Sequence, residues 1–245
     1  MENLTPAEET HEPRPRQITL SAEEASAIQT RFLTQVYGWM TGALAVTGGV
    51  AMVVGASPEL QELVVGNRLV FWGLLLLELF IVGYIGARLM KMSASQAIGA
   101  FAAYSVINGL TLGIIFMVYT ADSIASTFFV TAGTFGVMSA YGYFTRTDLS
   151  RWGNLLLMAL IGVIIATVVN LFLQNSMLYW ITSLLGVFIF VGLTAYDTQK
   201  IKELAFVGLE DEEVDRKAAV WGALTLYLDF VNLFLYLLRF FGRRK

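Results

Sequence analysis

The chain has 245 residues, of which 56% are hydrophobic and only 14% are charged. This composition is too apolar for an ordinary soluble domain, and the net charge of −3 gives no reason to expect a nucleic-acid partner. There is no cysteine, and the single histidine, His11, lies in a polar N-terminal stretch. Disulfides, thiolate metal sites and histidine-dependent catalysis within a membrane are therefore excluded.

The first 30 residues are polar and acidic and contain no apolar signal-peptide core, so we expect no cleavage. Low hydrophobicity with many charges is typical of disorder. The sequence therefore predicts two parts, an acidic disordered cytosolic tail over 1–30 and a transmembrane domain over 31–245. We expect the tail to be a solvated extension, although a docking role is the alternative.

Seven apolar segments follow the tail in chain order, and each is long enough to cross a hydrocarbon layer of ~30 Å as a helix. The segments cover approximately 33–56, 69–88, 95–119, 124–144, 153–173, 177–200 and 218–241. A membrane β-barrel would instead show alternating segments of about ten residues. The sequence therefore predicts an all-α membrane protein with seven transmembrane helices.

Positive charges between the segments predict the orientation, because lysine and arginine are enriched in cytoplasmic loops. With the N-terminus in the cytoplasm, only Arg68 falls in an outer loop before the last segment. Eleven positive residues then fall inside: Arg14, Arg16, Arg31, Arg88, Lys91, Arg146, Arg151, Lys200, Lys202, Arg216 and Lys217. Seven crossings place the C-terminus outside; a re-entrant last segment, the less favoured alternative, would keep it inside.

Small residues recur every four positions in the fourth segment, at Ala132, Gly136 and Ala140. This spacing lets two helix backbones approach closely in a membrane. We expect the stripe to serve ordinary packing within the bundle.

Three acidic residues fall inside apolar segments: Glu78, Asp197 and Asp229. An ionisable side chain at membrane depth is expensive and indicates a functional site, the alternative being a structural ion pair. On the last segment a polar stripe follows helical spacing and consists of Gly222, Thr225, Asp229, Asn232, Tyr236 and Arg239. The stripe predicts that this helix sits inside the bundle.

Two stretches near the C-terminus, FVGLTAYDTQKIK (190–202) and GALTLYLDFVNLFLYLLRFFG (222–242), strongly resemble the Bax inhibitor-1, or transmembrane BAX inhibitor motif, family. YGWMTGAL (37–44) and TDLSRWGN (147–154) resemble its bacterial inner-membrane members. The resemblance covers about 31–245. It implies a bacterial inner-membrane protein whose last helix is central and surrounded by the first six. The charge distribution predicts a periplasmic C-terminus, and we expect no cofactor.

The family resemblance also implies a slow, pH-sensitive calcium leak that is sensed by paired aspartates in the last two helices. The matching positions are Asp197 and Asp229, and the acidic position of the second helix matches Glu78. An arginine of that helix would latch onto Asp197. Arg88 is the candidate, but it lies one residue short of the family spacing, which turns a helix face by ~100°; Lys91 is a weaker substitute.

The residues themselves leave three functions open. Two neighbouring carboxylates share a proton, which makes a pH sensor without histidine, and with Thr225, Asn232 and water they would bind calcium weakly and transiently. The second function is an interaction protein that regulates a membrane-bound protease or a stress pathway without meaningful conduction. The third, an intramembrane aspartyl protease, is least favoured because bulky Leu226, Tyr227 and Leu228 precede Asp229. We therefore expect no enzyme.

Overall fold

The computed structural model describes residues 21–207 and 211–245, and within them it is helical apart from one isolated bridge between Tyr119 and Arg244. Seven helices are long and apolar enough to cross a membrane, as predicted. They are α1 (Ala22–Ala56), α3 (Arg68–Arg88), α4 (Ala94–Leu112) with its continuation α5 (Ile114–Val118), α6 (Ala121–Phe144), α7 (Ser150–Leu173), α8 (Ser176–Leu204) and α9 (Glu212–Phe241). A short helix, α2 (Pro58–Gln61), with a π-helical turn at Glu62–Gly66, connects α1 to α3, and a 3₁₀ turn at Leu89–Lys91 follows α3.

The first helix begins earlier than the sequence predicted. Ser21 forms a capping box with Glu24, in which the Ser21 hydroxyl accepts a hydrogen bond from the Glu24 backbone and the Glu24 carboxylate accepts one from the Ser21 backbone. This reciprocal cap stabilises a helix start. Residues 22–30, expected to end the disordered tail, are therefore helical, while residues 1–20 of that tail lie outside the described part of the chain.

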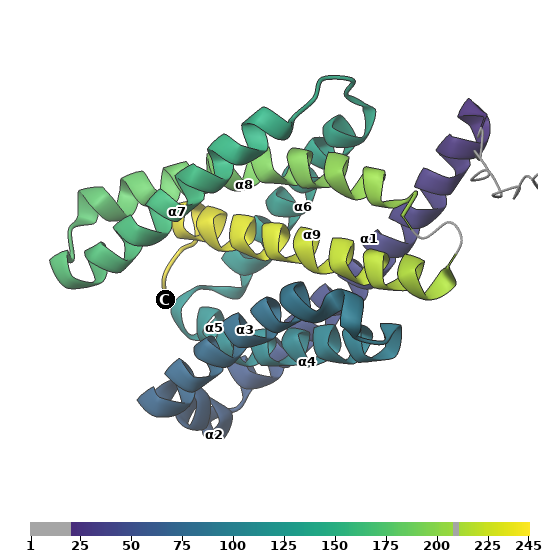
Figure 1. Cartoon of the computed structure of the whole chain (residues 1–245). Helices are drawn as coiled ribbons and strands as arrows, with labels where there is room; N and C mark the ends of the chain where they lie inside the picture. The colour runs from purple at the N-terminus through teal and green to yellow at the C-terminus, as the bar shows by residue number, and fades with distance from the viewer. Residues whose placement is uncertain (1–20, 208–210) are drawn as a thin grey trace, which may run out of the picture.

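The last helix, α9, lies in the middle of the bundle, between α7 and α8 on one side and α3 and α4 on the other (Figure 1). It packs against α1, α4, α6 and α8. Two thirds of its most apolar stretch (67%) is buried, compared with 6% for α3 and for α7. The prediction that all six other spans surround α9 is not confirmed in that form, because α3 packs mainly on α4 and α7 on α8.

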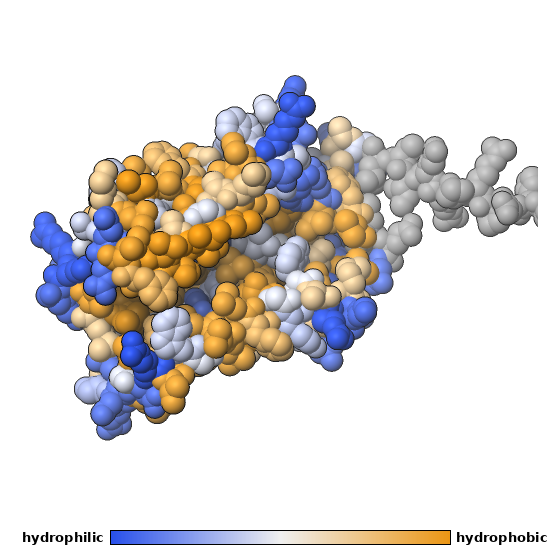
Figure 2. Space-filling model, turned by 60° about the vertical axis from the view of Figure 1, so that its left-hand side comes forward, coloured by the Kyte–Doolittle hydropathy of each residue, from blue (hydrophilic) through white to orange (hydrophobic). Residues whose placement is uncertain are grey.

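Most of the face shown in Figure 2 is apolar, and hydrophilic residues gather towards its edges. Large apolar side chains such as Leu69, Phe129 and Phe172 are more than 70% exposed. A soluble monomer rarely exposes apolar surface on this scale. An apolar surface that faces lipid explains both the exposure and the length of the helices.

The small-residue stripe of α6 packs within the bundle only in part: Ala132 is partly buried against the core, while Gly136 and Ala140 are exposed. Ala132, Gly136 and Ala140 line an apolar groove of about 880 Å³ between α1 and α6. A Cβ atom built on Gly136 would meet nothing within 4 Å. The close approach of α6 occurs at Gly142, where a Cβ atom would collide with the backbone carbonyl oxygen of Ala195 on α8.

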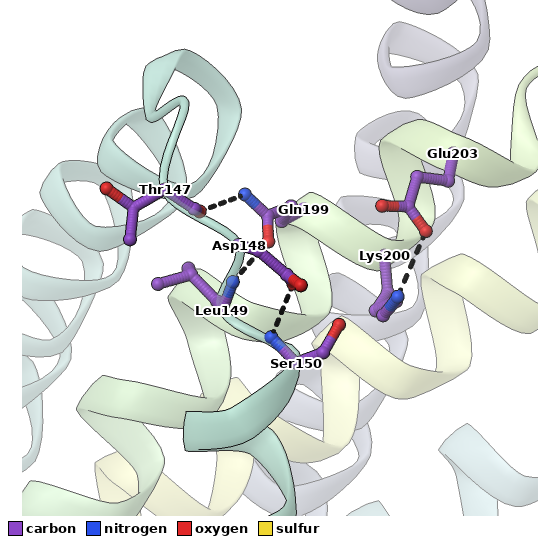
Figure 3. A network of polar contacts seen from close by, with 7 residues as sticks. All are labelled: Thr147, Asp148, Leu149, Ser150, Gln199, Lys200 and Glu203. Carbon is purple, nitrogen blue, oxygen red and sulfur yellow. Dashed lines mark hydrogen bonds and ion pairs between the residues drawn. The ribbon is translucent and has the colours of Figure 1, made fainter.

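The connection between α6 and α7 is fastened to α8 by one glutamine (Figure 3). The side-chain amide of Gln199 donates to the carbonyl oxygen of Thr147 at 2.9 Å and accepts from the backbone N–H of Leu149 at 2.9 Å. Beside it, the Asp148 carboxylate accepts a hydrogen bond from the Ser150 backbone, which holds the pKa of Asp148 below its ordinary value. The end of α6, the start of α7 and the C-terminal part of α8 are thus joined through Gln199 and Gly142.

The C-terminal residues after α9 are fastened to the connection between α5 and α6. The backbone N–H of Arg243 donates to the Ser123 hydroxyl, and that of Lys245 donates to the Val118 carbonyl at 2.9 Å. α9 has 30 residues and is therefore ~45 Å long. The end of α9 lies beside the start of α6, at the opposite end of the bundle from the α8–α9 connection, so α9 runs the whole length of the bundle.

Candidate site at the buried aspartate pair

The two predicted aspartates face each other across the contact between α8 and α9. Asp229 is 4% exposed, and its Oδ2 atom has no hydrogen-bond partner among the described residues. Asp197 is half-buried, and its carboxyl group lies within hydrogen-bonding reach of that of Asp229. A hydrogen bond between two carboxyl groups requires a proton on one of them, so the geometry fits a pair that shares one proton.

The pair forms because both helices are longer than the apolar segments predicted. α8 continues to Leu204, and α9 begins at Glu212 rather than near residue 218. The early start of α9 is explained by Asp211, whose carboxylate accepts from the backbone N–H groups of Glu213 and Val214 at 2.8 and 3.4 Å. Acidic residues in the first turn also favour a helix start electrostatically. The acidic stretch 211–215 therefore has a structural role as the cap of α9.

Thr225 and Asn232, the predicted supporting residues of α9, form no side-chain hydrogen bond to Asp197 or Asp229 among the described residues. Thr225 donates to the Trp221 carbonyl at 3.0 Å, and Asn232 donates to the Leu228 carbonyl at 2.8 Å. These bonds satisfy the side chains within their own helix. Asn232 instead lines a cavity on the side of α9 that faces α3 and α4.

Glu78, the third acid within an apolar segment, belongs to a separate hydrogen-bond network on that side of α9. It is buried on α3 and accepts from the Thr111 hydroxyl at 2.6 Å and from the Asn108 amide at 3.1 Å, both on α4. The Tyr227 hydroxyl of α9 donates to the Asn108 side-chain oxygen at 2.8 Å and lies 2.7 Å from the hydroxyl of Thr47 on α1. This four-helix network therefore contains Glu78, Asn108, Thr111, Tyr227 and Thr47.

A cavity of about 590 Å³ opens beside the four-helix network. Its walls include Glu78, Asn108 and Thr111 together with Asn232 and Arg239 of α9, and it extends along α9 to Leu228, the residue next to Asp229. Arg239 lies over the rings of Tyr236 and Tyr179 at 4.9 and 5.6 Å from their centroids. The cavity therefore places oxygen-bearing side chains of α3, α4 and α9 along the C-terminal part of α9, from Arg239 to Leu228.

The candidate latch residue is not joined to the pair in this structure. Arg88 is exposed at the end of α3, and the three ion pairs within 21–207 and 211–245 lie elsewhere, at Lys200–Glu203, Arg216–Glu212 and Lys217–Glu213. The end of α3 instead contacts α9 through Trp221, whose ring lies 3.3 Å from a Cβ atom built on Gly86. The latch role of Arg88 stays a prediction.

No group of three or more acidic or histidine side chains that could hold a metal ion occurs in the described part of the chain. Calcium prefers six to eight oxygen ligands, and the aspartate pair supplies two carboxylates. The pair is therefore suited at most to brief contact with a hydrated cation and not to storage of one.

Sequence reasoning missed Tyr227, Asn108, Thr47 and Gln199. Tyr227 and Asn108 stand in apolar stretches where an aromatic or a single amide has no distinguishing pattern. Asn108 was the stronger signal, because a buried amide in a span requires hydrogen-bond partners.

Seven apolar spans around a buried pair of carboxyl groups define a polytopic helical membrane protein with an acidic site in its core. The model of the family described as inhibitor of apoptosis-promoting Bax1 matches residues 29–245. The chain belongs to this family, the Bax inhibitor-1 family. It is 50% identical to the inner membrane protein YbhL of Escherichia coli K12 over 90% of this chain and 94% of that protein.

Two further relatives have no described role. An uncharacterized protein of Borreliella burgdorferi is 43% identical over 89% of this chain and 94% of its own length. An uncharacterized protein of Rickettsia prowazekii is 41% identical over 88% of this chain and 90% of its own length. The similarity therefore extends over nearly the whole of each chain.

Proposed function

We propose that this protein is a cation leak channel of the bacterial inner membrane, with calcium as a permeant ion, and that protonation of the Asp197–Asp229 pair gates it. The observation that carries this proposal is the juxtaposition of the two carboxyl groups in the core of the bundle. The inner-membrane location follows the printed name of the Escherichia coli relative.

The chemistry of the pair supports a pH-dependent gate. Two carboxylates in a low-dielectric site cannot both ionise freely, so the pair holds one proton over a range of pH and changes its charge outside that range. Within the described residues Asp229 Oδ2 has no hydrogen-bond partner, so a change in the charge of the pair changes a buried polar contact between α8 and α9. Acidification neutralises Asp197, weakens its attraction for Arg88 or Lys91 and favours opening.

The cavity beside the four-helix network supports entry of a cation into the bundle. It carries Glu78 and Asn232 on its walls and reaches Leu228, while Asp229 lies on the opposite side of α9. A cation that enters from the C-terminal end of α9 would meet carboxylate and amide oxygens, which are the ligands that calcium prefers. Weak, incomplete coordination favours passage over retention.

The decisive experiment is calcium flux into liposomes that contain the purified protein, measured across pH. The wild-type protein is expected to leak faster as pH falls. Asp197→Asn is expected to leak with little pH dependence, and Asp229→Asn to flatten the response. Glu59→Gln, which changes an exposed carboxylate in the connection between α1 and α3, is the matched control. If both aspartate variants keep the wild-type pH profile, the pair is a structural tie and not the sensor.

A second candidate function is regulation of a membrane-bound protease by direct contact. The apolar groove between α1 and α6 favours it, because Gly48, Gly49 and Gly136 face open space there. Small residues on an open helix face allow close approach of a partner helix. Gly136→Leu would then abolish co-purification with the protease and leave calcium flux unchanged, whereas the leak proposal requires no partner.

A further inference from the structure

Tyr227 and Asp229 lie two residues apart on α9 and therefore face nearly opposite sides of the helix, because each residue advances ~100° around it. Asp229 faces Asp197 on α8. Tyr227 points the other way, where its hydroxyl lies between Thr47 on α1 and Asn108 on α4. The helix that carries the proposed sensor is thus held by polar contacts on two opposite faces.

The hydroxyl of Tyr227 is the polar contact of α9 with the α1–α4 side. Within the described residues, the other hydrogen-bonding side chains along the apolar part of α9, Thr225 and Asn232, donate to carbonyls of α9 itself. The remaining faces of the helix are covered by apolar packing, which resists rotation about the helix axis less specifically than a hydrogen bond does. Within the described residues, Tyr227 therefore supplies the side-chain hydrogen bonds of α9 to α1 and α4.

The contacts around Tyr227 are well defined. Its side chain is fully buried, and the rings of Phe101 and Tyr104 meet it edge-on at centroid distances of 5.6 and 5.7 Å. The Asn108 amide that accepts from Tyr227 donates in turn to Glu78. Tyr227 and Asn108 thus donate in sequence towards the Glu78 carboxylate, which accepts at both of its oxygens, while the Thr47 hydroxyl donates to the Ser105 carbonyl.

Glu78 attaches α3 to α4 through two side-chain hydrogen bonds. Glu78 and Ile85 are the fully buried residues of α3, and Ile81 and Val82 pack against the core as partly buried side chains. A change in the orientation of Tyr227 would move the Asn108 amide and so change the main polar attachment of α3. The network therefore connects the helix with the proposed latch to the helix with the proposed sensor.

We propose that Tyr227 is a positioning residue for the aspartate pair: its hydroxyl, held between Thr47 and Asn108, fixes the rotation of α9 that aims Asp229 at Asp197 and couples that orientation to Glu78 on α3. This inference rests on the proposed function of the pair as a sensor. Among the helices packed on α9, the titratable side chains that reach Tyr227 or the pair are Asp197, Glu78 and Tyr104.

The test compares Tyr227→Phe with Tyr104→Phe, in purified protein in liposomes. Both substitutions remove one buried hydroxyl and keep the ring, but the described part of the chain offers the Tyr104 hydroxyl no hydrogen-bond partner, whereas Tyr227 has two. Two quantities are measured against pH: calcium flux, and the infrared absorption of protonated carboxyl groups. The infrared signal reports the shared proton of the pair whether or not the protein conducts.

Tyr227→Phe is expected to shift both profiles by about half a pH unit or more, the size of shift that loss of one hydrogen bond can produce. Tyr104→Phe is expected to shift neither. Glu78→Gln combined with Tyr227→Phe is expected to shift the profiles no further than the larger single change, because residues in one network are not additive.

Two results would overturn the inference. One is that Tyr227→Phe lowers the melting temperature but leaves the infrared profile of the carboxyl groups unchanged, which would make Tyr227 purely structural. The other is that Tyr104→Phe produces the same shift. If the wild-type protein shows no pH-dependent calcium flux but Tyr227→Phe still shifts the infrared profile, the proposed channel is refuted and the positioning role stands.

Discussion

At the scale of single residues, glycines with the same helical backbone have different roles, and their surroundings decide which. On α6, a Cβ atom at Gly142 would collide with the backbone of Ala195, while one at Gly136 would meet nothing within 4 Å. The collision is with main-chain atoms, which cannot rotate away as a side chain can. Gly142 is therefore required by the contact between α6 and α8, and Gly136 is not.

We predict that Gly142→Ala destabilises the protein by about 1–3 kcal/mol, because α6 must move away from α8 to accommodate the methyl group. Gly136→Ala on the same helix is expected to be neutral or to stabilise by up to ~1 kcal/mol through helix propensity. Thermal unfolding of the Gly142→Ala and Gly136→Ala variants in detergent measures both effects. Equal effects of the two substitutions would contradict it.

At the scale of elements, the connection between α6 and α7 is held by the side chain of a residue from a third helix. Gln199 uses both ends of its amide, as donor to Thr147 and as acceptor from Leu149. It lies two residues after Asp197 on α8. The C-terminal end of α8 is therefore fixed to the connection between α6 and α7, and we expect motion around the aspartate pair to involve α9 and α3 more than α8.

Replacing Gln199 with Ala is expected to release residues 145–149, because two hydrogen bonds are lost and each contributes about 1 kcal/mol. Hydrogen–deuterium exchange of the Leu149 amide should accelerate by roughly fivefold or more. Gln199→Glu keeps the acceptor for Leu149 and loses the donor to Thr147, so its effect should be smaller. Unchanged exchange in Gln199→Ala would show that packing alone holds the connection.

The start of α9 gives a second prediction at this scale. Asp211 accepts from two backbone N–H groups at the N-terminus of the helix. Asp211→Ala should destabilise the first turn by about 1 kcal/mol, seen as faster exchange at Glu213 and Val214. Asp211→Asn, which retains a capping oxygen, should behave almost like the wild-type protein, and an equal effect of Ala and Asn would argue against the cap.

At the scale of the whole molecule, the C-terminus is joined to the connection before α6, opposite the connection between α8 and α9. An odd number of crossings follows from this arrangement. The charge distribution then predicts a cytoplasmic N-terminus and a periplasmic C-terminus. A reporter enzyme that is active only in the periplasm should be active when fused after Lys245 and inactive when fused before Met1. Activity in the reverse order would overturn the orientation.

The sequence by itself determined the class of the protein, the seven spans and the three acids in them, because each depends on local patterns of hydrophobicity and charge. It also indicated that Asp197 and Asp229 belong together, through the family motif. The first helix begins before residue 31, where the predicted domain starts, because a capping box is a local hydrogen-bond arrangement that extends a helix beyond its apolar part.

Only the tertiary structure decided which neighbours the polar residues have. The small-residue stripe of α6 lines an open groove, Arg88 is exposed and unattached to Asp197, and Tyr227 connects α9 to two other helices, α1 and α4. Helical periodicity places a side chain on a face of its own helix. It does not specify which helix covers that face, because this depends on packing between segments that are as much as 180 residues apart in the chain.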